Sequence, residues 1–420
     1  MTINTAPSAD RSLSGLNYRY IIVAASFFTL LFMWGSNYCF GIFFNPLLDE
    51  FGWTRAITSG AFSLAIIMEG IGSMVTGRIF DRYGPRIVLI TCGIVFGVGF
   101  ILMSQVREIW HLYLLYGIVV GLGLSGSFVG TMWAVANWFT HRRGKMMAIV
   151  VSSVGVGTML MPPIANRLII DTGWRNAFVL VGWGAMILIV LSAIFIKTRT
   201  SNGETLPVYE TDKEKTHQPS PNPPLREALR SVRLWLICGI IMLWAVGKYA
   251  ILIHITPYAI EMGLHATQAT NILAVIGGAT FATTIALGMS VDRFGSYRTF
   301  TVGLAVMAAS LAWLLSTDSL WGLYVFAFAF SFGYSCGPVL MPSLVAEAFG
   351  LEGFGTLLGI VNLCACIGCG IGPALTGYLF DQTGNYTSAF TALAFLAVVS
   401  VLLSLVLLQL QDRLASRDAT

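Results

Sequence analysis

Twelve apolar stretches, each about as long as a helix needs to be to cross a bilayer, dominate this chain of 420 residues. Charged residues make up only 10% of the chain, against about 25% in an average soluble domain, so they cannot cover an aqueous globule. The pattern predicts an all-α membrane protein with lipid as its solvent. The stretches lie at about 19–45, 57–79, 86–106, 110–138, 145–170, 175–197, 234–258, 268–290, 298–316, 320–346, 355–380 and 386–410.

The basic residues predict how the chain is oriented. If the N-terminus is inside, nineteen lysines and arginines fall in cytoplasmic segments, and one, Lys248, lies within a span. Positively charged loops are retained on the cytoplasmic side during insertion. We therefore expect a multi-pass protein of a plasma membrane, or of the inner membrane in a bacterium, with both termini cytoplasmic. The outer segments hold only Arg55, Arg107, Arg167 and Arg175.

One long polar interruption, residues 198–233, separates the spans into six and six. It is rich in Pro, Glu, Lys and Thr, which predicts a cytoplasmic linker that is disordered in its middle. The expected organisation is a tail at 1–18, a six-helix bundle at 19–197, the linker, a second bundle at 234–410 and a tail at 411–420. The first seventeen residues lack the pattern of a cleaved signal peptide.

The two halves carry matching residues at one constant offset of 211 positions. A gapless offset from Tyr38 to Gly173 indicates a duplicated six-helix unit with parallel halves. Such pseudo-symmetry is expected of an alternating-access transporter. The matched pairs include Tyr38 and Tyr249, Gly77 and Gly288, Asp81 and Asp292, Arg82 and Arg293, Gly84 and Gly295, Gly144 and Gly355, and Pro162 and Pro373.

The segment Gly77-Arg-Ile-Phe-Asp81-Arg82-Tyr-Gly84-Pro-Arg86, between the second and third spans, resembles the signature of the major facilitator superfamily. The segment from Gly288 through Asp292 and Arg293 to Gly295 repeats it between spans eight and nine. The resemblance implies two pseudo-symmetric bundles, with these residues gating the molecule by latching its halves in the outward-facing state. The alternative is a basic turn with no moving part.

Within that superfamily the chain resembles the monocarboxylate porters and the oxalate–formate antiporters. The likeness rests on the segments from Tyr38 to Trp53 and from Asn137 to Gly144, and on Pro257-Tyr-Ala. Those porters usually carry an arginine for the substrate carboxylate four residues before the first glycine of the second signature, where this chain has Thr284. Either the substrate is not a simple monocarboxylate, or the positive charge comes from elsewhere.

Lys248 is the candidate for that charge because it lies near the middle of the seventh span. A lysine at that depth costs about 2.5–3.5 kcal/mol even on a lenient scale, so it is not expected to face lipid. Its repeat partner is Asn37, so the scaffold does not require a charge there. We predict an ammonium group that binds a substrate carboxylate; the alternative is a side chain that snorkels to the outer headgroups.

Glu69 is the only acid well inside a span, and its repeat partner is Thr280. A carboxyl group in a poorly hydrated site suits a proton carrier. The alternatives are a structural partner for Lys248 or a group bonded to backbone. His254, six residues after Lys248, is a second candidate for proton coupling, as a gate or an interfacial side chain.

Smaller polar side chains complete the predicted substrate site. The sequence offers no metal-ligand spacing, phosphate loop or catalytic triad, so neither a cofactor nor a metal is expected. Gly121-Leu-Gly123-Leu-Ser-Gly126 fits a dinucleotide pattern, but it lies within an apolar helix with no strand before it. The candidates besides Lys248 are Trp34, Asn37, Tyr38, Thr280, Thr284, Tyr334 and Asn362.

Together these features predict a monomeric, proton-coupled secondary transporter of a small organic anion, with protons and the lipid bilayer as its other partners. No nucleic-acid partner is expected, because the basic residues follow one membrane face. One alternative is an organic anion exchanger of the oxalate–formate kind, and another is proton-driven drug efflux. A sensor or membrane enzyme lacks support, because the short loops leave no room for a signalling or catalytic domain.

Overall fold

The computed structural model describes residues 10–53, 55–139, 142–197, 200–201, 204–205 and 225–417. Within them, 12 helical segments are long and apolar enough to cross a membrane, which confirms the all-α membrane fold. The outer parts of the predicted tails, 1–9 and 418–420, and the middle of the predicted linker, 206–224, lie outside the described residues.

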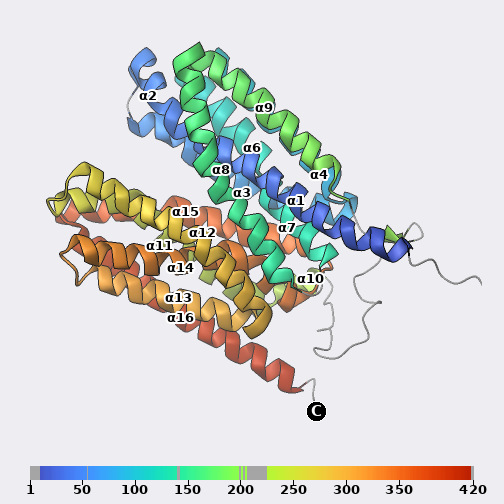
Figure 1. The fold of residues 1–420 in the computed structure, drawn as a ribbon. Coiled ribbons are helices and arrows are strands. Elements are labelled where there is room, and N and C mark those ends of the chain that lie inside the picture. The colour runs from blue at the N-terminus through green and yellow to red at the C-terminus, as the bar shows by residue number, and fades with distance from the viewer. Residues whose placement is uncertain are drawn as a thin grey trace, which may run out of the picture.

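The first six spans form one bundle and the last six form the other (Figure 1). The first bundle consists of α1 (Asp10–Tyr38) with α2 (Phe40–Phe51), α3 (Arg55–Tyr83), α4 (Pro85–Leu102) with η1 (Met103–Gln105), a composite fourth span, α8 (Arg143–Thr172) and α9 (Trp174–Ile194). The second consists of α11 (Val232–Glu261), α12 (Ala266–Phe294), α13 (Ser296–Leu314), α14 (Leu320–Phe349), α15 (Phe354–Thr383) and α16 (Tyr386–Arg417).

Within the predicted linker, the structure shows two short strands and a helix. Strand β1 (Thr200–Ser201) pairs antiparallel with β2 (Glu204–Thr205). Helix α10 (Leu225–Arg230) then leads into α11. The hydroxyl of Ser231 caps α11 by accepting a hydrogen bond from the backbone N–H of Arg233 at 3.2 Å.

The sequence repeat reappears in the positions at which helices begin. Four pairs of helix starts lie 211 positions apart: Arg55 and Ala266, Pro85 and Ser296, Ile109 and Leu320, and Arg143 and Phe354. The tight turns before the second pair use Gly84 and Gly295, whose φ angles of 77° and 82° suit glycine. The two halves therefore share one backbone plan.

The first half departs from this plan at two places. Its first span breaks at Cys39, between α1 and α2, whereas the equivalent α11 is continuous. Its fourth span is built from α5 (Ile109–Leu112), the π-helical η2 (Tyr113–Val120), α6 (Gly121–Leu124) and α7 (Ser127–Trp138), whereas the equivalent α14 is one helix. Such π-helical segments often accompany functional sites.

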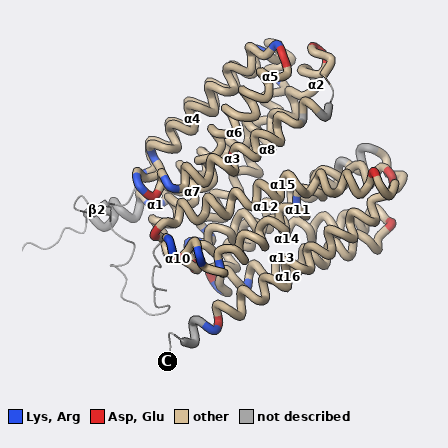
Figure 2. Tube along the Cα trace, turned by 180° about the vertical axis from the view of Figure 1, so that it is seen from behind, with Lys and Arg blue, Asp and Glu red and all other residues tan. Residues whose placement is uncertain are grey.

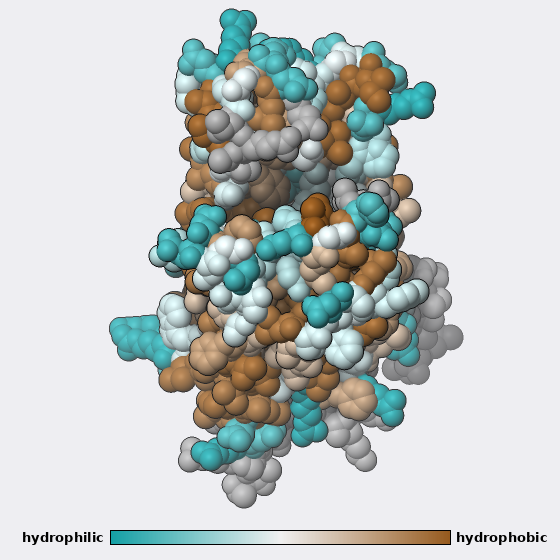
Figure 3. Space-filling model, turned by 90° about the vertical axis from the view of Figure 1, so that its left-hand side faces the viewer, coloured by the Kyte–Doolittle hydropathy of each residue, from teal (hydrophilic) through white to brown (hydrophobic). Residues whose placement is uncertain are grey.

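The two bundles meet at one end and diverge at the other (Figure 1). Most described Lys and Arg residues gather at the end where the bundles meet, called here the closed end (Figure 2). Seen from the opposite end, the halves are separated by a furrow (Figure 3). The interface between the halves is therefore accessible from one side of the molecule.

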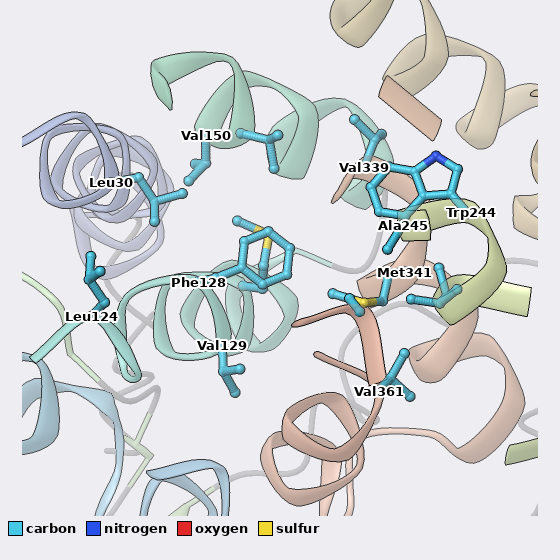
Figure 4. Packing of buried hydrophobic residues seen from close by; sticks show 14 of the residues in the cluster. Leu30, Leu124, Phe128, Val129, Val150, Trp244, Ala245, Val339, Met341 and Val361 are labelled. Atoms are coloured by element: carbon cyan, nitrogen blue, oxygen red, sulfur yellow. The ribbon is translucent and has the colours of Figure 1, made fainter. Parts of the chain in front are cut away.

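Buried apolar side chains fill the interior of both bundles and form one cluster (Figure 4). Leu30, Leu124, Val129 and Val150 surround Phe128 in the first half, and Trp244, Val339, Met341 and Val361 pack in the second. The cluster includes residues of both halves, so each bundle has a packed apolar interior.

Candidate functional site

At the closed end, the signature carboxylates bind backbone N–H groups of the opposite half. Asp81 on α3 accepts hydrogen bonds from the N–H groups of Gly355 and Thr356 at 2.9 and 2.8 Å. Its repeat partner Asp292 on α12 accepts from Gly144 and Lys145 at 3.0 and 3.2 Å. These N–H groups belong to the first turns of α15 and α8, where unpaired donors and the helix dipole favour an anion.

Glycine allows the helices to touch beside these carboxylates. A Cβ atom on Gly77 would collide with the carbonyl oxygen of Gly355, and a Cβ atom on Gly288 would collide with the Cβ atom of Ala148. Arg82 and Arg293 do not cross the interface in the same way; each lies over the aromatic ring that follows it, at 5.2 and 5.3 Å. The backbone contacts and the two aspartates therefore hold the closed end together.

The two sides of the closed end are unequally bonded. Asp81 also accepts from the Thr356 hydroxyl at 2.8 Å and from Trp133 Nε1 at 3.1 Å, whereas the structure shows no such bonds at Asp292 in its described part. The hydroxyl of Ser73 on α3 donates to the Gly359 carbonyl oxygen on α15 at 3.2 Å. The contact between α3 and α15 is thus the more polar of the two.

We expect Asp81→Asn to open the closed end more than Asp292→Asn does. Asparagine keeps one acceptor oxygen, and loss of a charge-assisted hydrogen bond removes about 1.5–3 kcal/mol. A cysteine at Ser343, which is 4% exposed and faces Met147 across the interface, reports opening by its alkylation rate in a variant without native cysteines. Asp81→Asn should raise that rate about tenfold, and Asp292→Asn by less than about threefold. A larger increase in the alkylation rate for Asp292→Asn than for Asp81→Asn would contradict the unequal bonding of the two sides.

Lys248 lies at the interface between the halves and is 7% exposed. Its Nζ lies over three aromatic rings, 4.2 Å from the centroid of Tyr334 and 4.9 Å from those of Trp244 and Tyr249. Ring faces stabilise an ammonium group without neutralising it. Among the described residues, no carboxylate forms an ion pair with Lys248.

Glu69 on α3 contacts the opposite half directly. It is 2% exposed, and its carboxylate accepts hydrogen bonds from Asn362 Nδ2 at 2.9 Å and from Cys366 Sγ at 2.8 Å, both on α15. Since these are side-chain donors, the alternative of a group bonded only to backbone does not describe its position. The carboxylate joins α3 to α15 in the middle of the interface.

These features identify a family when they are set beside known proteins. The sequence model of the Major Facilitator Superfamily matches residues 26–289 and 247–419. The chain belongs to the Major Facilitator Superfamily. It is therefore a multi-pass secondary transporter and not an enzyme, and the predicted family is confirmed.

Curated relatives within this superfamily include two mammalian transporters. Monocarboxylate transporter 12 of Mus musculus is 26% identical over 413 residues, covering 91% of this chain and 84% of that protein. Monocarboxylate transporter 13 of Rattus norvegicus is 27% identical over 373 residues, covering 88% and 84%. These distant relatives support the superfamily and the predicted branch resemblance.

Solved structures of the superfamily share the fold. The transporter FucP, crystallised in the outward conformation, superposes with a TM-score of 0.70 at 16% identity, covering 93% of this chain and 99% of that one. The human organic anion transporter MFSD10 (TETRAN) gives 0.71 at 16% identity, covering 92% and 99%. At such identities the comparison concerns the fold alone.

The other predicted substrate ligands fall into two groups in this superfamily member. Tyr38 interacts with Tyr249, and Tyr334 contacts Lys248. Tyr38 and Tyr334 therefore belong to the cluster of side chains around Lys248. Trp34 instead donates to Ser127 Oγ at 3.1 Å, and Asn37 Oδ1 accepts from the Tyr116 hydroxyl at 2.8 Å within the first half. The Nδ2 of Asn37 is buried without a hydrogen-bond partner among the described residues.

Thr280, Thr284 and His254 lie within the second half. Thr280 bonds to its own helix at the Ile276 carbonyl oxygen, and Thr284 Oγ1 lies 3.1 Å from Ser335 Oγ on α14. His254 contacts the Tyr386 hydroxyl and the Pro373 carbonyl oxygen at 3.3 and 3.1 Å. The structure does not bring these three side chains to the cluster around Lys248.

The sequence reasoning did not assign roles to Trp244 and Tyr116. Trp244 lies four residues before Lys248, and a spacing of four on a helix could have indicated that their side chains meet. Tyr116 carries no comparable signal, because its partner Asn37 comes from a distant part of the chain. The spacing of four between Asn362 and Cys366 indicates a shared helix face, and both side chains bond to Glu69. Within the described residues, no group of three or more His, Cys, Asp or Glu side chains could hold a metal ion.

Proposed function

We propose that this protein transports a small organic monoanion, in the first place a monocarboxylate, together with a proton across a plasma membrane. The observation that carries the proposal is Lys248, a buried ammonium group with aromatic neighbours and no paired carboxylate in the described chain. A buried charge without a counter-ion is expensive, and a substrate carboxylate would supply one. Transport then follows from alternating exposure of this group to the two sides.

Charge balance favours a monoanion over a dianion. The central interface contains two buried charged side chains in the described chain, the ammonium of Lys248 and the carboxyl of Glu69, both less than 10% exposed. A monoanion bound at Lys248 leaves one excess negative charge, which a proton on Glu69 removes. A dianion would leave a second negative charge without a partner, and such a charge is costly in a low-dielectric interior.

The names of similar proteins agree with an anionic substrate. Several curated relatives are monocarboxylate transporters, and one structural neighbour is an organic anion transporter. In this chain, Thr284 stands where the porters usually carry an arginine, and it bonds to Ser335. We infer that Lys248, on the neighbouring helix α11, takes over the role of that cation, with Tyr38 and Tyr334 beside it.

The closed end would face the cytoplasm, with the tails and linker on that side. Its basic residues support this orientation through the positive-inside rule (Figure 2). The furrow would then open to the outside, and the bonds of Asp81 and Asp292 would hold this outward-facing state. The signature residues thus act as a latch that must release before substrate reaches the cytoplasm.

Cysteines at the two ends of α14 test the orientation. We expect a cysteine at Glu352, which is exposed at the closed end, to react with a membrane-impermeant reagent only from the cytoplasmic side. A cysteine at Asp318, exposed at the opposite end, should react only from outside. Each change is made in a variant without native cysteines and assayed in right-side-out and inverted vesicles. Reactivity of Glu352→Cys from outside would overturn the orientation.

The proposed substrate class is tested with the purified protein. The panel contains the monocarboxylates acetate, L-lactate, pyruvate and benzoate, the dicarboxylates oxalate and succinate, and the neutral amide lactamide. A ligand that binds the folded state raises the melting temperature by mass action. We expect at least one monocarboxylate to stabilise the protein, and the dicarboxylates and lactamide to have no effect. Stabilisation by a dicarboxylate alone, or by no acid, would refute the monocarboxylate proposal.

A further inference from the structure

The two buried charges of the interface share one cluster of side chains without touching each other. Glu69 is bonded to Asn362 and Cys366, and the rings around Lys248 come from α11 and α14. The two charges act on each other through space, and polar side chains around both of them provide a second route for coupling. Among the described residues, the titratable side chains that face these charges from α1, α11, α14 and α15 are Tyr38, Tyr249, Tyr334, Cys336, Cys366 and Cys369.

Tyr249 contacts Lys248 and also the side chains of α1 and α15. The centroid of its ring lies 4.9 Å from Lys248 Nζ, and its side chain interacts with Tyr38 on α1 and with Cys369 on α15. Cys369 follows Cys366, the donor to Glu69, by three residues on the same helix.

The two tyrosines also mark the pseudo-symmetry of the molecule. Tyr38 and Tyr249 lie 211 positions apart, so they are equivalent positions of the two repeats. Residues related in this way meet close to the pseudo-two-fold axis. Tyr38 is moreover the last residue of α1, directly before the break at Cys39. Their contact therefore depends on how the two halves are placed.

We propose that Tyr38 and Tyr249 are positioning residues whose hydroxyl groups couple occupancy of Lys248 by a monocarboxylate to proton uptake by Glu69. The inference rests on the function proposed above. When the acid anion binds the ammonium group, the tyrosines reorient and the local charge becomes negative. One proton then passes from a hydronium ion of the solvent to a Glu69 oxygen: an O–H bond of the hydronium ion breaks, an O–H bond forms on the carboxyl group, and a water molecule remains.

The inference is tested by proton uptake on binding, measured with a pH-sensitive dye in weakly buffered detergent solution. The probe is L-lactate, or the panel acid that binds most tightly in its place. Wild-type protein should take up about one proton per bound acid near the pH of strongest coupling, and Glu69→Gln none. Tyr249→Phe keeps the ring over Lys248 but loses the hydroxyl group, and Tyr38→Phe likewise loses only a hydroxyl group. Measured at saturating acid, and so counted per bound acid, each variant should take up less than about half a proton.

Tyr113→Phe is the matched control, because its hydroxyl donates to the Ile57 carbonyl oxygen at 2.8 Å away from the cluster. It should behave like wild type. Undiminished proton uptake by Tyr249→Phe and Tyr38→Phe, with acid bound, would overturn the coupling role of the two tyrosines but leave the proposed function intact. Absence of acid binding by the wild-type protein would instead refute the proposed function, and with it the coupling role of the tyrosines. Thermal melting in the presence of the acid confirms that each variant is folded.

Discussion

Replacement of Lys248 by Gln should weaken binding of the transported monocarboxylate about 100-fold and abolish its uptake. Loss of a charge-assisted hydrogen bond to a carboxylate removes about 1.5–3 kcal/mol, and each 1.4 kcal/mol is a factor of ten in affinity. The variant should nevertheless fold. The ammonium group contacts aromatic rings but no paired carboxylate in the described chain, so its removal leaves no buried anion behind.

Lys197→Gln provides the matched control for this change. Lys197 also lies over a tyrosine ring, that of Tyr18 at 5.2 Å, but it lies after α9 and outside the interface between the halves. Its replacement should leave affinity and uptake unchanged. Binding is measured by thermal shift and uptake with radiolabelled acid in proteoliposomes. Full uptake by Lys248→Gln would eliminate the lysine as the anion ligand, whatever its effect on stability.

The repeat explains why so much of the fold follows from the sequence. Apolar length predicts each span, and the offset of 211 positions relates helix starts in the two halves, as it does for Arg143 and Phe354. The signature predicts the turns at Gly84 and Gly295 because a sharp reversal before a helix needs a positive φ. These features are local or repeated, so a single sequence contains them.

The central site depends on contacts that no local pattern specifies. Glu69 and Lys248 stand out because a charge within a span is rare, but Asn362 and Cys366 reach Glu69 across 293 and 297 positions of sequence. Thr284 stands where the monocarboxylate porters usually carry an arginine, yet in the structure its hydroxyl bonds to Ser335. The break at Cys39 and the π-helical η2 have no counterpart in the second half, so the repeat could not predict them.

Glu69→Gln should abolish proton-driven accumulation while leaving exchange of labelled for unlabelled acid intact. A proton gradient supports about tenfold accumulation per pH unit when one proton accompanies each monoanion. Glutamine mimics the protonated carboxyl permanently: its amide oxygen can still accept from Asn362, and the contact between α3 and α15 persists. The loaded transporter therefore still changes state, but the empty one cannot release a proton to the cytoplasm.

Exchange and net uptake in the same proteoliposomes separate the possible roles of Glu69. Glu50→Gln is the control, since Glu50 pairs with Arg175 at 2.6 Å away from the interface between the halves and should leave both activities unchanged. Loss of exchange together with uptake would make Glu69 a structural or substrate-binding group. Exchange without any proton-driven net uptake in the wild-type protein would indicate an anion exchanger. Because Glu69 binds donors of the opposite half, its protonation can alter both charge balance and the contact that closes the transporter. Joining these effects in one carboxyl group would give a direct physical link between the proton and the movement of the halves.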